Sequence, residues 1–325
     1  MKTLGIFPAS GALGTSTSTH LLRDVPANHV VLISRHPEKT PQVHVQAGVG
    51  TRQADYSQSP AELKSAFSGI DILFLISYPS HQHKLRTELH RKAIAAADRA
   101  GVRHIFYSSL AFAGVPPTDT SVAEVMGAHL DSEAYLRELA EKDEGLSYTI
   151  VRQGLYSEST PIYTAFFDPT PNYDPKAEEW VKIHIPHHGG GPGVSWVKRD
   201  ELGEANAALI ARYLLDKERF ERDWAGWVNG TVVFTGSKAW RLDETVEVLE
   251  GVANKRLIII EVSVDEYVAQ PEVLAVFGSE ELARTWATAW EAIKKGETAA
   301  VTSDLEVVLG RKPEDFHITV AERRA

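Results

Sequence analysis

A short glycine-containing loop near the start of the chain constrains its fold more than any other feature. The loop, residues 8–14, follows an apolar strand-like run at residues 4–7 and leads into a helix-like stretch that reaches Leu22. Gly11 would let the backbone approach a pyrophosphate, and Gly14 would let the helix pack closely on the sheet. The N-terminus of that helix would offer free N–H groups to phosphate. The loop therefore predicts a dinucleotide-binding fold with these cofactor-binding residues: Ser10, Gly11, Leu13 and Gly14.

Pro8 departs from this pattern, because a G-x-x-G-x-x-G loop would carry its first glycine at that position. Proline lacks the backbone N–H and fixes φ. We therefore expect the loop to bind its cofactor more weakly, or in an altered pose, than a loop with all its glycines.

Strand-like and helix-like segments alternate through the first half of the chain. Residues 72–77 begin with a continuous apolar run, which is typical of a strand covered on both faces. Further strands are predicted at 29–34 and 102–107, and a weaker one within 43–55 that ends at Ala54-Asp55. Helices are predicted at 61–67, after Ser59-Pro60, and from Leu85 to Gly101. Strands alternating with helices in this way indicate a parallel, doubly wound sheet of Rossmann type.

The second half of the chain has a different character. After a predicted strand at 146–155, residues 157–193 are rich in Pro, Tyr, Phe, His and Gly and predict long loops over a cleft. Helices are then predicted at 202–215, 242–252 and 280–295, and strands at 232–236 and 257–264. We expect an α/β fold with an NAD(P)-binding domain over 1–155 and a smaller C-terminal α/β substrate-binding domain over 156–325. The boundary is expected to be discontinuous, with part of 195–236 returning to the first domain.

Composition narrows the classes of function. The 325 residues carry a formal net charge of −10, which argues against broad affinity for nucleic acid. The chain has no cysteine, so it has no disulfide, no thiolate metal site and no cysteine nucleophile. No apolar run approaches the length needed to cross a bilayer, and the N-terminus does not read as a signal peptide. We expect a cytoplasmic protein that does not act on membranes.

Several short motifs follow one another along nearly the whole chain. They are the glycine loop, Ala54-Asp55, residues 67–71, 95–102 and 106–109, His129 with Ser132-Glu133, and residues 148–156, 199–203 and 310–313. Their order and spacing resemble the NmrA-like family, an atypical group of short-chain dehydrogenases/reductases, and within it the bacterial NADPH-quinone reductase branch. The resemblance implies a Rossmann-type fold that binds a nicotinamide dinucleotide.

The residues that end the second strand predict the choice of cofactor. They are Ser34-Arg35-His36, with no carboxylate before Glu38. A carboxylate at this point would accept a hydrogen bond from the ribose 2′-OH of NAD, whereas an arginine can grip a 2′-phosphate. Arg35, with Ser34 as a further donor, therefore predicts NADP(H). The alternative is that Arg35 is simply a solvated loop residue.

Other cofactor contacts are expected at the ends of later strands. By the resemblance, Asp55 is the acid that meets the adenine. Ser77 and Tyr78 should border the ribose or the pyrophosphate, because they end the fourth strand. Gln153 and Tyr156 end the next-but-one strand and face the same crevice, where one of them would contact the nicotinamide ribose or amide.

The chain lacks the Tyr-x-x-x-Lys pair of conventional short-chain dehydrogenases: Tyr135 is followed by Leu139, and Tyr107 by Ala111. By resemblance to isoflavone-reductase-type enzymes, His129 occupies the position of their catalytic lysine. A histidine can exchange protons at neutral pH. Glu133 lies four residues on and is expected to orient the ring. The alternative is a purely structural His–Glu pair at the edge of the nicotinamide pocket.

Three further groups of residues could take part in substrate or metal binding. Tyr107 and Ser109 end a sheet strand, where Ser109 would either bind a substrate carbonyl or only support the loop. Aromatic residues in the loop-rich stretch, Tyr163, Phe166, Phe167, Tyr173 and Trp180, are candidates for lining a flat aromatic or quinone-like substrate site. His184, His187 and His188 adjoin three glycines and favour a mobile loop; no metal site is predicted.

These features favour an NADPH-dependent reductase that acts on a quinone, an enone or a similar small apolar acceptor, because hydride transfer to a good acceptor can rely on positioning alone. The missing Tyr-x-x-x-Lys pair and Pro8 leave two alternatives open. One is a non-catalytic NADP(H)-binding redox sensor that passes its state to a protein partner. The other is a redox-neutral biosynthetic enzyme on the same fold.

Overall fold

A seven-stranded parallel sheet forms the centre of the computed structural model, which describes residues 2–115, 118–167, 169 and 180–322. The strand order is β3-β2-β1-β4-β5-β6-β8. The strands are β1 (Leu4–Phe7), β2 (Val30–Ser34), β3 (Gly50–Gln53), β4 (Ile72–Ile76), β5 (His104–Leu110), β6 (Ser147–Gln153) and β8 (Gly230–Phe234). The order reverses between β1 and β4, so the crevice at the carboxyl ends of these two strands is the expected ligand site.

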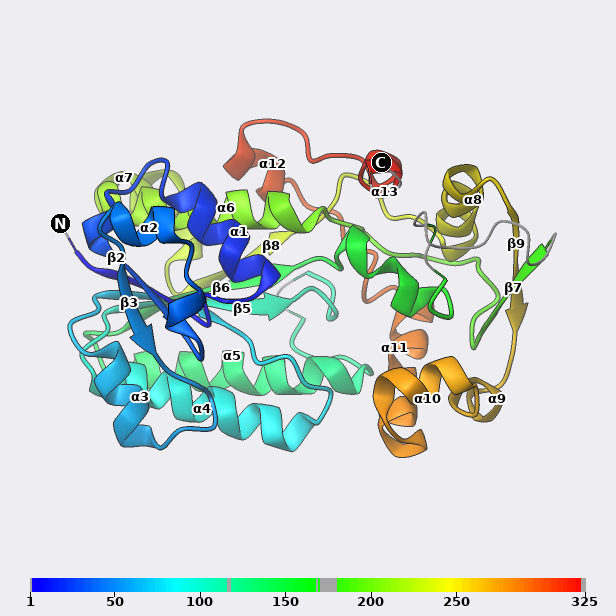
Figure 1. The fold of residues 1–325 in the computed structure, drawn as a ribbon, viewed down its shortest axis with the longest axis horizontal. Coiled ribbons are helices and arrows are strands. Elements are labelled where there is room, and N and C mark those ends of the chain that lie inside the picture. The colour runs from blue at the N-terminus through cyan, green and yellow to red at the C-terminus, as the bar shows by residue number, and fades with distance from the viewer. Residues whose placement is uncertain (1, 116–117, 168, 170–179, 323–325) are drawn as a thin grey trace.

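Helices cover both faces of this sheet. The helices α3 (Pro60–Phe67), α4 (His83–Arg99) and α5 (Glu124–Lys142) gather on one face, and α1 (Ala12–Leu21), α6 (Arg199–Leu215) and α7 (Lys217–Asp223) on the other (Figure 1). The continuous apolar run of β4 is buried between these layers. The predicted doubly wound α/β fold of Rossmann type is thus confirmed.

A segment from the second half of the chain completes the large sheet. β8 pairs in parallel with β6, and α6 packs against α1 so closely that a side chain at Gly203 would collide with Ser16. The short helix α12 (Asp304–Leu309) also lies beside α6 and β8, and Asp304 accepts a hydrogen bond from the backbone N–H of Val233. Residues 199–234 therefore pack with the dinucleotide-type sheet.

A smaller α/β unit lies at one end of the molecule (Figure 1). It contains the parallel pair β7 (Trp180–Ile185) and β9 (Arg256–Glu261). Its helices are α8 (Leu242–Ala253), α9 (Val264–Val268), α10 (Pro271–Phe277), α11 (Glu280–Lys294) and α13 (Phe316–Glu322). An apolar core of its own includes Trp196, Tyr267 and Trp290. The division at residue 155 stays a prediction.

Two segments hold more than the sequence indicated. The strand expected within 43–55 is β3, and α2 (Gln42–Gln46) precedes it, because Pro41 starts a helical turn and Gly48 adopts φ +98° before the strand. The stretch 157–193 contains a short 3-10 helix at Ser157–Tyr163 and the strand β7, so it is not loop throughout. Within the described ranges, no helix is long and apolar enough to span a membrane.

Candidate functional site

A cavity of about 520 Å³ opens at the carboxyl ends of β1, β4, β5 and β6. It is lined by most of the predicted site residues: Ser10, Gly11, Leu13, Gly14, Arg35, Asp55, Ser77, Tyr78, Ser109, His129, Gln153 and Tyr156. Ser34 and Tyr107 are buried behind this lining. The residues predicted from sequence thus gather around one cavity, and their roles in binding or catalysis stay predictions.

The glycine loop and α1 form one wall of the cavity. Gly11 precedes α1 with extended backbone and has no side-chain cap, so the first N–H groups of this ten-residue helix are open to a ligand. Gly14 is required by packing: a Cβ there would lie 2.7 Å from the carbonyl oxygen of Pro8 and 2.8 Å from that of Ala9. Pro8 itself lines the cavity beside these residues. The loop thus keeps the features that accommodate a pyrophosphate.

Arg35 and Asp55 form an ion pair at the edge of the cavity, where β2 and β3 end. Arg35 Nε lies 3.4 Å from Asp55 Oδ2, and the arginine side chain is 70% exposed. Burial raises the pKa of Asp55, but hydrogen bonds from Ser57 and the nearby charge of Arg35 outweigh this effect and lower the pKa below its ordinary value. Asp55 is thus a carboxylate, and the exposed guanidinium can reach a phosphate outside the cavity wall.

Gln153 carries an unsatisfied polar atom on the cavity wall. Its Nε2 donates to Asn206 Oδ1 at 3.4 Å, while its Oε1 is buried without a hydrogen-bond partner. A buried acceptor without a partner is costly. An amide N–H of a bound ligand would satisfy it, as a nicotinamide carboxamide can.

A buried polar cluster lies beside the cavity where α4 and α5 meet the sheet. Arg86 Nη2 lies 2.8 Å from His129 Nε2, and His129 Nδ1 lies 3.2 Å from the hydroxyl of Tyr107. Because a guanidinium only donates, Nε2 of His129 must accept, and the ring proton resides on Nδ1. Burial, followed by the charge of Arg86, holds the pKa of His129 well below its ordinary value. His129 is therefore a neutral hydrogen-bond acceptor for Arg86.

His90 repeats this arrangement behind the cavity wall. Its Nε2 accepts from the backbone N–H of Tyr78 at 2.8 Å, so its proton resides on Nδ1, which faces Ser132 Oγ and the Tyr107 hydroxyl. Burial lowers the pKa of His90 to about 3. Burial likewise raises the pKa of Tyr107 above its ordinary value. Tyr107 thus contacts the two histidines and does not line the cavity.

Glu133 does not orient His129, and that expectation was wrong. Its carboxylate accepts from Arg152 Nε at 3.0 Å and Nη2 at 2.7 Å, both side chains being fully buried. Ser109 Oγ also donates to Glu133, at 2.6 Å. Arg152 reaches across from β6 and captures the acid that the helical spacing assigned to His129. Ser109 therefore lines the cavity, but its hydroxyl proton is donated to Glu133.

The opposite end of the cavity is apolar and partly aromatic. Its lining there includes Leu110, Phe112, Leu155, Ile162, Tyr163 and Trp286. Of the aromatic residues proposed from sequence, Tyr163 lies in the cavity lining. Phe166 and Phe167 pack with the core of the smaller α/β unit, and Trp180 is exposed on β7. Tyr173 lies outside the described residues. Trp286, from α11, also lines the cavity.

The histidine-rich segment lies away from this cavity. His184 is on β7, the rings of His187 and His188 stack, and His187 Nδ1 accepts from the backbone N–H of Gly189. Among the described residues, no three His, Cys, Asp or Glu side chains converge as metal ligands would.

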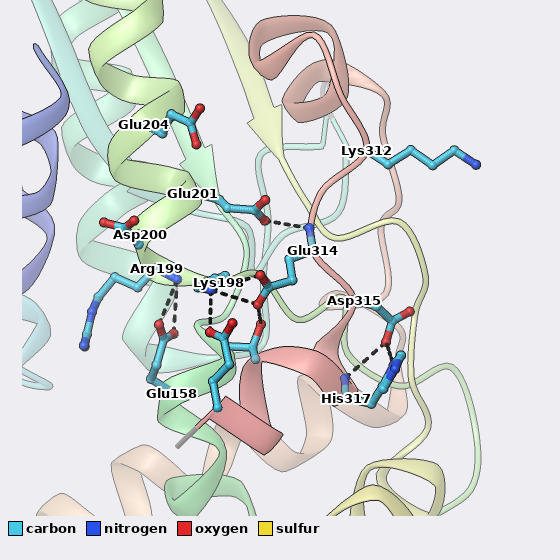
Figure 2. A network of polar contacts seen from close by, with 12 residues as sticks. Glu158, Lys198, Arg199, Asp200, Glu201, Glu204, Lys312, Glu314, Asp315 and His317 are labelled. Atoms are coloured by element: carbon cyan, nitrogen blue, oxygen red, sulfur yellow. Dashed lines mark hydrogen bonds and ion pairs between the residues drawn. The ribbon is translucent and has the colours of Figure 1, made fainter. Parts of the chain in front are cut away.

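Arg199, at the start of α6, is a further cavity residue that the sequence did not single out for this role. Glu158 accepts from its backbone N–H at 3.1 Å, and Lys198 Nζ lies 2.9 Å from Glu314 Oε1 and 2.7 Å from Glu322 Oε2 (Figure 2). The guanidinium of Arg199 lies over the ring of Tyr156, 5.8 Å from the ring centre. Asp200 accepts from Ser16 Oγ of α1 at 2.5 Å. The first turn of α6 thus holds a cation beside the dinucleotide loop.

Comparison with known proteins decides the family. The model of a family described as NAD(P)H-binding matches residues 9–172, half of the chain. The chain belongs to this NAD(P)H-binding family. The match contains residues 9–14 of the glycine loop, Arg35, the Arg86–His129 cluster and Gln153, so it covers most of the cavity lining; Arg199 and Trp286 lie beyond it.

Two curated relatives refine this assignment. An NmrA-like family domain-containing oxidoreductase from Aspergillus flavus is 26% identical over 309 residues, which cover 94% of this chain and 89% of the relative. Quinone oxidoreductase 2 from Escherichia coli is 38% identical over 156 residues, which cover 48% of this chain and 50% of the relative. The resemblance to the NmrA-like group is confirmed: the protein is an NAD(P)H-binding oxidoreductase of NmrA-like type.

Solved structures agree. The triphenylmethane reductase of Citrobacter sp., complexed with NADP(H), superposes with a TM-score of 0.75 at 26% identity and covers 99% of both chains. An NADPH-dependent quinone oxidoreductase from Escherichia coli, complexed with NADPH, gives a TM-score of 0.76 at 26% identity, over 98% of this chain and 99% of that one. The NmrA negative transcriptional regulator shares the fold, with a TM-score of 0.61 at 16% identity. The predicted cofactor, NADP(H), is thus confirmed.

Proposed function

We propose that the protein is an NADPH-dependent reductase of a small, apolar, quinone-like or enone-like acceptor. The observation that carries this proposal is one continuous cavity: the glycine loop and α1 form its dinucleotide side, and Leu110, Phe112, Tyr163 and Trp286 form an apolar side. Bound NADPH supplies a hydride at its nicotinamide ring. A flat acceptor between that ring and the apolar side would need positioning more than acid–base catalysis.

Within this proposal, each part of the cavity has a binding role. Arg35 holds the 2′-phosphate, and Asp55 faces the adenine. The open N–H groups of α1 bind the pyrophosphate, with Ser10, Gly11 and Leu13 along its path. Ser77, Tyr78 and Tyr156 border the ribose. Gln153 Oε1, which is buried without a partner, accepts from the carboxamide of the nicotinamide.

A binding titration followed by a turnover assay tests the proposal. Tryptophan fluorescence would measure the Kd of NADPH, NADP+, NADH and NAD+, since Trp286 lines the cavity. We expect the NADP pair to bind more tightly, and the Arg35→Ala variant to lose about tenfold in NADPH affinity with little change for NADH. The matched control is Arg23→Ala, an exposed arginine of similar type outside the cavity lining.

Turnover separates the reductase from its alternatives. Oxidation of NADPH that depends on 1,4-naphthoquinone supports the proposal. Tight NADPH binding without turnover on naphthoquinone or a cyclic enone contradicts it and favours a sensor with a protein partner. Equal affinity of the wild type for NADPH and NADH, unchanged in Arg35→Ala, contradicts the role given to Arg35.

A further inference from the structure

Arg86 is a buried cation on the wall of the cavity. It lies in the first turn of α4, is only 6% exposed and belongs to the cavity lining. Its Nε donates to the carbonyl oxygen of Tyr78 at 2.7 Å and its Nη1 to that of Val125 at 3.1 Å. Its Nη2 lies 2.8 Å from His129 Nε2 and 3.4 Å from Ser77 Oγ. Four contacts therefore fix the plane of the guanidinium.

All four partners of Arg86 are neutral. Burial lowers the pKa of Arg86 below its ordinary value, and the phenols of Tyr107, Tyr56 and Tyr156 oppose this effect. Within the described part of the chain, the hydrogen-bond partners of its guanidinium include no carboxylate. The neighbouring imidazoles of His90 and His129 are neutral as well, because burial lowers the pKa of both. A buried charge without a counter-ion is costly unless a function requires it.

The contacts also leave donor capacity toward the cavity. A guanidinium has five N–H groups, and four hydrogen bonds use four of them. The weakest, to Ser77 Oγ, is replaceable by a better acceptor. The unused N–H is on Nη1, so what Arg86 presents beside Ser77 and His129 is a fixed positive charge and the Nη2 N–H that now contacts Ser77.

We propose that Arg86 is a catalytic residue that stabilises the oxyanion formed on a neutral carbonyl acceptor; this rests on the reductase function proposed above. The acceptor takes up hydride at the carbon β to its carbonyl, where a new C–H bond forms; the C=C π pair shifts to become the enolate double bond, the C=O π pair moves onto oxygen, and the cofactor is left as NADP+. The enolate oxygen accepts from Arg86 and then takes a proton from water; in a quinone, tautomerisation of the ring C–H proton onto the second oxygen completes the hydroquinone. His129 is a positioning residue, because its Nε2 orients the guanidinium.

This assignment selects between two chemical classes of acceptor. A neutral quinone or enone gains negative charge as hydride adds, and a preorganised cation lowers the energy of that transition state. A triphenylmethane dye is a cation that loses its charge on hydride addition, so Arg86 disfavours both its binding and its reaction. We therefore infer that the substrates are neutral conjugated carbonyl compounds and not cationic dyes.

Binding of 4-nitrophenol to the NADP+-bound wild type gives a first test that does not depend on turnover. The probe is mostly a neutral phenol at about pH 6 and mostly a phenolate at about pH 8.5, while Arg86 stays charged throughout. Calorimetry should show the phenolate binding at least about tenfold more tightly than the phenol. Equal affinity for the two forms, or no binding of either, contradicts the proposal.

Two variants carry the second test. In Arg86→Met, kcat/KM for 1,4-naphthoquinone should fall about 100-fold, the phenolate preference should vanish, and kcat/KM for the cationic dye malachite green should not fall. The Kd of NADPH should stay within about threefold of the wild type. Arg91→Met, which removes an exposed arginine from the same helix, is the matched control and should behave as the wild type.

The outcomes distinguish the role of Arg86 from the reductase function itself. A loss of NADPH affinity in Arg86→Met that matches its loss of activity would overturn the proposal, because Arg86 would then hold the cofactor. If Arg86→Met does not fold, the phenolate preference of the wild type decides. A wild type that prefers the phenolate but oxidises no NADPH with naphthoquinone contradicts the reductase function and leaves the anion site standing.

Discussion

Arg152 holds both carboxylate oxygens of Glu133, at 2.7 and 3.0 Å, with both side chains fully buried. The pair joins β6 to α5 behind the substrate side of the cavity, and Ser109 of β5 adds a third attachment through its hydroxyl. Glu133, one helical turn from His129, therefore has a structural role: it holds β5, β6 and α5 together.

The Glu133→Ala variant should be strongly destabilised. Among the described residues, it leaves the buried guanidinium of Arg152 with the half-exposed Asp119 as its one anionic partner, and breaking a buried pair in this way costs about 3–5 kcal/mol. Urea denaturation would measure the change in the free energy of unfolding. Glu138→Ala removes an exposed acid from the same helix and should change little. Similar stability of the two variants would contradict a structural role for the buried pair.

Gly14→Ala should destabilise the fold, whereas Gly11→Ala should not. A methyl group at Gly14 collides with the carbonyl oxygens of Pro8 and Ala9, so we expect a loss of about 2 kcal/mol in stability. A methyl group at Gly11 meets open space, so that variant should fold as the wild type. If a pyrophosphate lies against Gly11, the variant should lose about tenfold in NADPH affinity. Thermal unfolding with and without NADPH measures both, and unchanged affinity in Gly11→Ala would contradict the assigned path of the pyrophosphate.

The stability of the protein should fall as pH decreases from 7 to 5. His90 has a folded-state pKa of about 3, below the ordinary value of 6.5, so between these values the unfolded chain binds a proton that the folded protein does not. The free energy of unfolding contributed by such a group is complete above about pH 6.5, and about 2 kcal/mol of it is lost by pH 5. Urea denaturation at the two pH values checks this, with His90→Gln as the comparison. A loss of the same size in the variant would show that His90 is not its source.

His129 should tolerate a substitution that keeps an acceptor for Arg86. The side-chain oxygen of His129→Gln can accept from Nη2, whereas His129→Leu offers no acceptor and leaves the guanidinium free to turn. We expect kcat to fall about 10-fold or more in the leucine variant and to recover largely in the glutamine variant, with an unchanged pH profile. Equal losses in both, together with the disappearance of an ionisation near neutral pH from kcat/KM, would instead identify His129 as a proton donor.

Local sequence patterns predicted the elements that short-range chemistry decides. The apolar run of β4 and the spacing of Gly11 and Gly14 have one structural meaning, and both segments formed as expected. The segment 43–55 gave no sign of α2, in which the side chains of Val43 and Val45 are both exposed. Edge segments with little burial carry a weak pattern.

The hydrogen-bond and ion-pair partners in the site could not be predicted in the same way. Arg86 follows His83, Lys84 and Leu85 and resembles a solvated residue on a charged helix; only the packing of α4 against α5 and β4 buries it. Its partner His129 was placed in the site by resemblance, but the partner assigned to that histidine, Glu133, was taken by an arginine from a strand 19 residues further on. Long-range competition between partners leaves no local signal.

Lys198, Arg199 and Asp200 are consecutive, yet their attachments lead in three directions: to the C-terminal acids Glu314 and Glu322, to Tyr156 on the cavity wall, and to Ser16 of α1. The first turn of α6 therefore contacts the helix that follows the nucleotide loop, the cavity wall and the C-terminal segment. A dinucleotide bound at the N-terminus of α1 would thus lie two contacts away from the C-terminal segment: Ser16 with Asp200, and Lys198 with Glu314 and Glu322.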